Sequence, residues 1–322
     1  MLIDSLPRAL LGALAAYALF YLPGRALVRR GSTALPLPFA RILASTISST
    51  LLGTGLAAAE KFSIEALLGG SIAVACAGFV AGRRFFPGPP TAGFAPAAAA
   101  AAKDWVGPTV AAMAMFAYWP AYPTFLGASD STAYVATGVS LAHHGGLARE
   151  DDVGARVPVG LRAEIFDSMS QEFGSTGPPY RRMPGAMLIE TLDAVRAWPC
   201  FFPVPSVWAA TFVVAGATAE ESVEEAAPGY APVFAALALW AYWLLARSWL
   251  GPAWGLFAVV LLAASGPFYM GARLPLSEPI AAFFGLAGLA IVSTVGHRLR
   301  PLDAALAGAA LGAAVFTRLE TG

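Results

Sequence analysis

Charged residues are scarce in this sequence. Asp, Glu, Lys and Arg make up 12% of the 322 residues, against 57% hydrophobic residues. A soluble domain of this length needs more charge on its surface, so the composition excludes that class and indicates an integral membrane protein. The formal net charge is zero and no basic motif occurs, so we expect no nucleic-acid partner.

Cysteine and metal-binding patterns are also sparse. The two cysteines, Cys76 and Cys200, are far apart in or beside apolar segments, which favours free, buried thiols over a disulfide. His143 and His144 are adjacent, a spacing that does not suit one metal. With no Gly-rich phosphate loop and no metal-ligand cluster, we expect no cofactor and no obligatory metal ion.

Long apolar runs dominate instead, and each is long enough for the hydrocarbon core of a bilayer. They fall at about 9–24, 42–59, 66–82, 105–125, 230–247, 251–270, 279–296 and 302–317. The alternating short segments of a β-barrel are missing. The predicted fold is an all-α polytopic membrane protein of about eight transmembrane helices, with a large extracytoplasmic loop that contains interfacial helices.

Two shorter apolar stretches, 184–198 and 204–218, leave a choice open. They form either a hairpin, which brings the count to ten helices, or helices that lie flat on the membrane. Leu188, Leu192 and Val195 fall at i, i+4 and i+7. This spacing favours an interfacial helix over 184–198.

The cations predict the orientation, because cytoplasmic loops are rich in Lys and Arg. One side collects Arg25, Arg29, Arg30, Arg83, Arg84, Lys103, Arg247, Arg298 and Arg300. We therefore expect a multi-pass protein of a bacterial plasma membrane, with segment 127–229 and loop 271–278 outside the cytoplasm.

A Pro- and Ala-rich stretch, 85–103, divides the chain. Residues 1–104 are predicted to form an accessory module of three spans. Residues 105–322 are predicted to form the core. We also expect this chain to be the N-terminal part of a longer protein.

The long polar segment begins with Asp130, shortly after the 105–125 span, at the start of a predicted amphipathic helix. A carboxylate just above the bilayer can accept a proton from an incoming hydroxyl. It can equally act only as a favourable charge at the start of that helix. Asp151 and Asp152 are further acidic candidates in the same segment, with a solvated acidic turn as the alternative.

Two basic groups accompany these acids on the predicted outer face. Tyr180, Arg181 and Arg182 lie in a proline-rich turn, where paired guanidinium groups can bind phosphate or only anionic headgroups. Loop 271–278 adds Arg273 and, at the start of the next span, Glu278. Arg318 and Glu320 end the last span on this face. An ionisable residue at a span end is costly unless it is paired or functional.

The order of these motifs resembles the GT-C superfamily of membrane glycosyltransferases, over residues 105–320. The relevant motifs are Asp130 with Tyr134 and Leu141, the turn Pro178-Pro179 to Pro184-Gly185, Leu244-Leu245-Ala246-Arg247 with Gly251, Ser277-Glu278, and Gly308-x-x-x-Gly312 with Thr317-Arg318. Protein O-mannosyltransferases and aminoarabinose transferases belong to this superfamily. Many relatives have two adjacent acidic residues in the first loop, whereas Ser131 follows Asp130 here.

The resemblance implies a transferase that takes a sugar from a polyprenyl-phosphate donor to an extracytoplasmic acceptor. Asp130 then corresponds to the general base and Glu278 to the acidic residue of the later outer loop. The turn around Tyr180 and the arginines correspond to the region of the lipid phosphate, and Arg318 to the arginine that closes the following helix. A carboxylate base favours direct displacement and inversion at the anomeric carbon.

A transporter or flippase is the alternative from another class. It predicts paired charges within spans, internal repeats or broken helices, and the sequence has no clear repeat. A structural scaffold would not explain why Asp, Arg and Glu concentrate on one face.

Overall fold

The computed structural model describes residues 2–85, 105–122, 130–150, 152–168, 181–183, 187–189, 195–199, 201–217, 226–295 and 300–318. Its N-terminal helices are α1 (Leu2–Phe20), α2 (Leu22–Leu27), α3 (Leu37–Ala58) and α4 (Ile64–Phe85). Then come α6 (Val106–Tyr118), α7 (Asp130–His144), α8 (Asp152–Arg156), α9 (Val159–Ile165) and α11 (Val204–Ala217). The short turn η2 (Ala227–Gly229) leads into α13 (Tyr230–Ala264), α14 (Gly266–Arg273), α15 (Glu278–Val295) and α16 (Pro301–Arg318). The described residues are mainly helical and contain no closed sheet, as the sequence predicts.

Two of the described helical stretches are long and apolar enough to cross a membrane, Ala227–Ala264 and Glu278–Val295. Both are consistent with membrane association. The first stretch reverses direction, however, because Gly251 has φ 78° and ψ 172°, a conformation that glycine adopts without steric cost. A Cβ atom on Gly255 would lie 2.9 Å from the Cα atom of Arg247, whereas a straight helix would separate these positions by about 12 Å.

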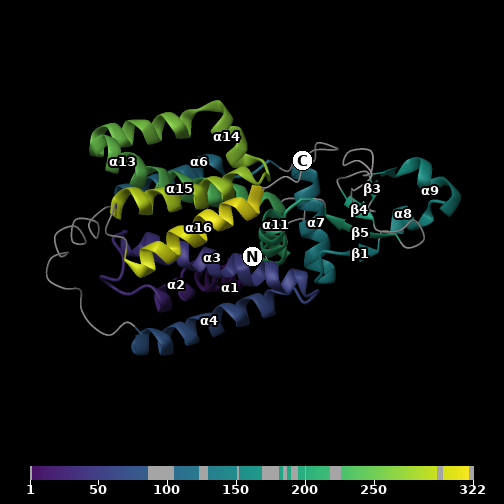
Figure 1. Ribbon diagram of the computed structural model, residues 1–322, viewed down its shortest axis with the longest axis horizontal. Helices are drawn as coiled ribbons and strands as arrows, with labels where there is room; N and C mark the ends of the chain where they lie inside the picture. The colour runs from purple at the N-terminus through teal and green to yellow at the C-terminus, as the bar shows by residue number, and fades with distance from the viewer. Residues whose placement is uncertain are drawn as a thin grey trace.

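α13 is therefore a helical hairpin, and its reversal lies where the sequence predicts the boundary between the spans 230–247 and 251–270. In Figure 1 its second half follows the upper edge of the bundle toward α14. A further break follows at Ser265, where φ −68° and ψ 135° separate α13 from α14. The predicted span 251–270 is thus two helical pieces.

One hydrophobic core joins the first and second halves of the chain. Phe39 of α3 packs edge-on against Trp240 and Phe283, with ring centroids 5.3 and 6.2 Å apart. Phe234 of α13 contacts Trp208 of α11 at 5.0 Å. α13 packs on α6 and α15, and α15 packs on α16. α3, α13, α15 and α16 run along the long axis of the molecule, whereas α7 and α11 run across it (Figure 1). α3 shares the core of the other long helices, although the sequence assigns it to an accessory module.

α6 is shorter than the span predicted over 105–125. It ends at Tyr118, and Trp119 is extended, with φ −88° and ψ 141°. The reason is Pro120, because a proline disfavours helical conformation in the residue before it. The 13 residues of α6 cover about 20 Å, less than the thickness of a hydrocarbon core.

α7 and α11 pack closely, because Gly138 leaves room for the α11 backbone. A Cβ atom on Gly138 would lie 2.6 Å from the Cβ of Ala209 and 2.9 Å from the carbonyl oxygen of Ser206. α11 is buried between α7 and α3, and its Trp208 donates a hydrogen bond to Thr50 over 3.0 Å. The sequence leaves open whether 204–218 is part of a hairpin or lies flat on the membrane. The apolar residues of this segment pack against other helices.

The Gly138 contact predicts opposite outcomes for two alanine substitutions. Gly138→Ala should destabilise the protein by about 1–3 kcal/mol, since the added methyl group meets backbone that cannot move cheaply. Gly308→Ala in α16 should leave stability unchanged or slightly higher, because a Cβ there meets nothing within 4 Å. Thermal unfolding of both variants in the same detergent measures the difference. Equal melting temperatures would contradict the close packing.

The polar segment forms a small antiparallel sheet beyond one end of the helical bundle (Figure 1). Its strands are β1 (Arg149–Glu150), β2 (Asp167–Ser168), β3 (Arg181–Met183), β4 (Met187–Ile189) and β5 (Arg196–Pro199). Their order in the sheet is β1-β5-β4-β3-β2. A hydrogen bond from Phe62 N to the Gly145 carbonyl (2.8 Å) and an ion pair between Arg196 and Glu60 attach this region to the bundle.

The predicted interfacial helix over 184–198 is wrong, because β4 and β5 occupy most of its described residues. Burial alternates from Val195 to Trp198, with Val195 and Ala197 buried and Arg196 and Trp198 exposed. This two-residue period is that of a strand. Val195 and Ala197 form a separate small core with Ile189 and Phe166, which no helix over this segment would make.

Candidate functional site

Two of the predicted site residues meet where α15 begins and α16 ends. Nη2 of Arg318 lies 3.6 Å from Oε1 of Glu278, and both side chains are about half exposed, at 57% and 43%. A pair this exposed contributes at most about 1 kcal/mol to stability. The ion pair therefore contributes little to holding the fold together.

The second carboxylate oxygen of Glu278 has a different environment. Oε2 is buried and accepts no hydrogen bond from the residues that the structure describes. A buried oxygen of this kind is costly unless a donor satisfies it. Glu278 therefore has a charge partner on one oxygen and an unsatisfied acceptor on the other.

Asp130 is the exposed first residue of α7, and neighbouring contacts connect that helix to the same region. One turn later, the Tyr134 ring lies 5.4 Å from that of Phe201. The next residue, Phe202, meets Phe316 of α16 edge-on at 6.2 Å. The second turn of α7 and the last turn of α16, which carries Arg318, therefore contact two consecutive residues.

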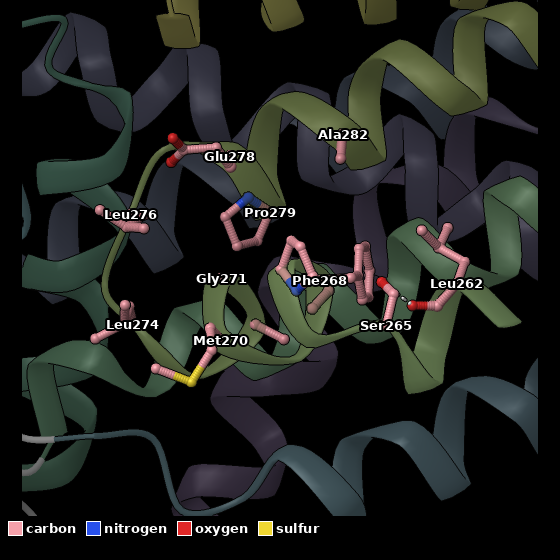
Figure 2. Close-up of a pocket in the computed structure, with 13 residues that line it drawn as sticks. Leu262, Ser265, Phe268, Met270, Gly271, Leu274, Leu276, Glu278, Pro279 and Ala282 are labelled. Carbon is pink, nitrogen blue, oxygen red and sulfur yellow. Dashed lines mark hydrogen bonds between the residues drawn. The ribbon is translucent and has the colours of Figure 1, made fainter. Parts of the chain in front are cut away.

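An apolar cavity of about 490 Å³ lies beside Glu278, within the usual range for ligand pockets. It is bounded by α13, α14 and α15 and lined by Ala235, Leu262, Ser265, Pro267, Phe268, Met270, Gly271, Ala272, Leu274, Leu276, Glu278, Pro279 and Ala282. Figure 2 shows Glu278 at one edge, on the side of Leu276, and Ser265 with Leu262 on the other side. The Ser265 hydroxyl donates to the Leu262 carbonyl over 2.8 Å, so the lining is almost wholly apolar.

Arg273, at the end of α14, holds the segment that follows α6. Its Nε and Nη2 donate to the Pro120 carbonyl over 3.2 and 3.0 Å. Its Nη1 donates to the hydroxyls of Tyr122 (3.0 Å) and Tyr269 (2.7 Å). The guanidinium also lies 3.9 Å from the centroid of the Tyr122 ring. Of five N–H hydrogens, one stays uncommitted among the described residues, so Arg273 has little capacity left for the phosphate contact predicted for it.

This arrangement predicts that Arg273→Lys destabilises the protein by about 1–3 kcal/mol, because an ammonium group cannot reproduce the planar set of hydrogen bonds or the stacking. The measurement is the melting temperature in detergent. Arg318→Lys is the matched control, and it should change stability by less than about 0.5 kcal/mol. A loss of equal size in both variants would refute the role given to Arg273.

The remaining predicted residues are less well placed. Tyr180, Asp151 and Glu320 lie outside the described residues. Arg181 and Arg182 belong to β3, where their backbone pairs with Ser168 and Asp167 of β2, and Asp152 begins α8. His143 and His144 are exposed at the end of α7. Within the described ranges no three His, Cys, Asp or Glu residues gather for a metal, and the expected independence from metal stays a prediction.

Sequence reasoning missed the cavity and the residues that surround it. Its lining comes from apolar residues of three helices that look like any other membrane span, so their convergence has no local signature. The break between α13 and α14 did have one, in Ser265-Gly266-Pro267. A glycine and a proline side by side within an apolar run indicate an interrupted helix.

Comparison with known proteins adds no assignment: neither a protein-family model, nor a curated protein, nor a solved structure matches this chain.

Proposed function

We propose that this chain is an integral membrane glycosyltransferase of the GT-C kind. It transfers a sugar from a polyprenyl-phosphate donor to an acceptor outside the cytoplasm, such as a cell-envelope glycan, lipid or protein. The proposal rests on the order of sequence motifs and on one structural observation, an apolar cavity lined by an acidic residue, Glu278, that is paired with a basic one, Arg318.

That observation suits an amphiphilic ligand with a charged head. Glu278 and Ala282 both line the cavity, and they are one turn apart on α15, so the cavity extends about 6 Å along the helix from the carboxylate. Arg318 stands beside the same carboxylate. An isoprenoid tail would occupy the apolar space, and its phosphate would remain at the polar end with the arginine.

In the proposed topology α1 and α2 together form the first span, and α3, α4 and α6 form the next three. The first half of α13 is a span, and its second half forms another together with α14. α15 and α16 are the last two spans. α11 is held among them without being a span. The reversal at Gly251 then faces the cytoplasm, as the arginine distribution favours. Asp130, Glu278 and Arg318 face the opposite side together with the sheet.

The proposed reaction is a direct displacement. Asp130 accepts the proton of the acceptor hydroxyl, and the acceptor oxygen forms a bond to the anomeric carbon from the face opposite the phosphate. The bond between that carbon and the phosphate oxygen breaks, and its electron pair leaves with the lipid phosphate. Arg318 stabilises the departing negative charge. Oε2 of Glu278 accepts a hydrogen bond from a sugar hydroxyl and orients the donor.

A transporter is the second candidate, and the break at Ser265 favours it. Discontinuous helices beside a cavity are typical of substrate sites in secondary transporters. The cavity lining argues for the transferase, since it contains two polar residues, Ser265 and Glu278, and the Ser265 hydroxyl is already used by Leu262. A small polar substrate would find few partners there.

The two candidates differ in the fate of a labelled sugar. Membranes that contain the chain, and matched membranes without it, are supplied with polyprenyl phosphate bearing a radiolabelled sugar. The transferase moves label from the carrier to another molecule and releases polyprenyl phosphate. Label that stays on the carrier and only changes leaflet would overturn the transferase in favour of the transporter.

A further inference from the structure

Tyr230, the first residue of α13, is fully buried, and its hydroxyl is engaged with the loop that leads to Glu278. The side chain has no exposed surface, and its Oη donates a hydrogen bond to the carbonyl oxygen of Leu276 over 3.3 Å. Leu276 lies in loop 274–277, which connects α14 to α15. A buried phenol requires such a partner, whereas phenylalanine would fill the same apolar space without one.

The same tyrosine lies near the two helices that begin with the acidic residues assigned to the reaction: η2, which precedes it, packs on α7, and α13, which it begins, packs on α15. It lies within electrostatic range of Tyr134, one turn after Asp130 on α7, and of Glu278 on α15. The preceding Gly229 packs closely on α11, because a Cβ atom there would lie 2.8 Å from the Phe212 ring. The start of α13 thus packs against α11 and lies near both helices that begin with a carboxylate.

We propose that Tyr230 is a positioning residue that holds the Glu278 loop against the Asp130 helix and so fixes the separation of the two carboxylates. The inference rests on the proposed glycosyltransferase function. The base and the carboxylate that orients the donor must be held in one geometry for a rapid reaction, because a small misplacement of reacting groups lowers the rate strongly. The Leu276 carbonyl is the point where Tyr230 controls that geometry.

The first test compares Tyr230→Phe with Tyr242→Phe, the same change in the same helix three turns away. Tyr230→Phe should lower kcat by about tenfold, the worth of one buried hydrogen bond. Its KM for the lipid donor should stay unchanged, since the cavity is intact. Tyr242→Phe should retain the parent kcat. If both variants kept the kcat of the unsubstituted chain, the proposal would be overturned.

The second test does not depend on sugar transfer. Ser277 is buried, so a Ser277→Cys chain with Cys76 and Cys200 replaced by Ser should react slowly with a membrane-impermeant maleimide. Adding Tyr230→Phe should increase the labelling rate about fivefold or more as the loop opens, and adding Tyr242→Phe should not.

The two readouts separate the possible failures. An unchanged labelling rate with Tyr230→Phe means that the hydroxyl does not hold the loop, and the proposal is overturned. Faster labelling with an undiminished kcat overturns it as well, because loop position then has no effect on the reaction. If the parent chain transfers no sugar while labelling rises as expected, the glycosyltransferase function falls, and the loop contact remains as a structural fact.

Discussion

Asp130→Asn is expected to lower the rate of sugar transfer by about 10²–10⁴-fold, the usual contribution of a general base. Asn keeps the size of the side chain and one acceptor oxygen, and it cannot take a proton at neutral pH. Asp130 is exposed and begins α7, so the substitution should cost at most about 1 kcal/mol of helix-dipole stabilisation. Initial rates with a labelled polyprenyl-phosphate sugar measure the effect.

Asp130→Glu is the matched control for this substitution. It retains a carboxylate at the start of the helix and should recover part of the lost rate, while its longer side chain misplaces the base. If Asp130→Asn transferred sugar at the same rate as the unsubstituted chain, Asp130 would be only a favourable charge at a helix terminus. A lost rate together with a lowered melting temperature in Asp130→Asn alone would point to folding instead of catalysis.

Gly271→Leu is expected to raise the KM for a long-chain lipid donor by about tenfold or more, equivalent to ~1.4 kcal/mol of binding. Gly271 lines the cavity, and a Cβ atom there would meet nothing within 4 Å. The leucine side chain can therefore enter the space assigned to the lipid without displacing the protein. The measurement is the dependence of initial rate on donor concentration.

Donor length and a second glycine provide the controls for Gly271→Leu. A donor with a single short prenyl chain needs less of the cavity and should lose less affinity. Gly308→Leu, in α16 and away from the cavity, should leave KM unchanged, since a Cβ there also meets nothing within 4 Å. Equal KM values for all three chains would remove the cavity from the donor site.

Residues at helix ends were predictable from the sequence, because an ionisable group beside an apolar run marks where a helix meets water. Glu278 and Arg318 were each assigned to an end on the same face, and the structure pairs them at 3.6 Å. The reversal at Gly251 was predictable for a similar local reason. A glycine followed by a proline interrupts a helix whatever surrounds it.

Features that depend on distant partners were not predictable. β5 pairs with β1, so that Ala197 faces Arg149, and strands of two to four residues have too little local pattern to reveal such pairing. A helical spacing of Leu188, Leu192 and Val195 therefore suggested the wrong element. The cavity escaped prediction for the same reason, since it exists only where three apolar helices converge.

The central claim is that the cavity beside Glu278 binds the tail of a lipid phosphate. Photolabelling with a polyprenyl phosphate that bears a benzophenone on its first isoprene units, followed by peptide mapping, tests this claim most directly. We predict labelled peptides from segment 262–282. Excess unmodified polyprenyl phosphate should abolish this labelling, and Gly271→Leu should reduce it. Labelling spread over the outer surfaces of the helices, or resistant to that competitor, would contradict the claim.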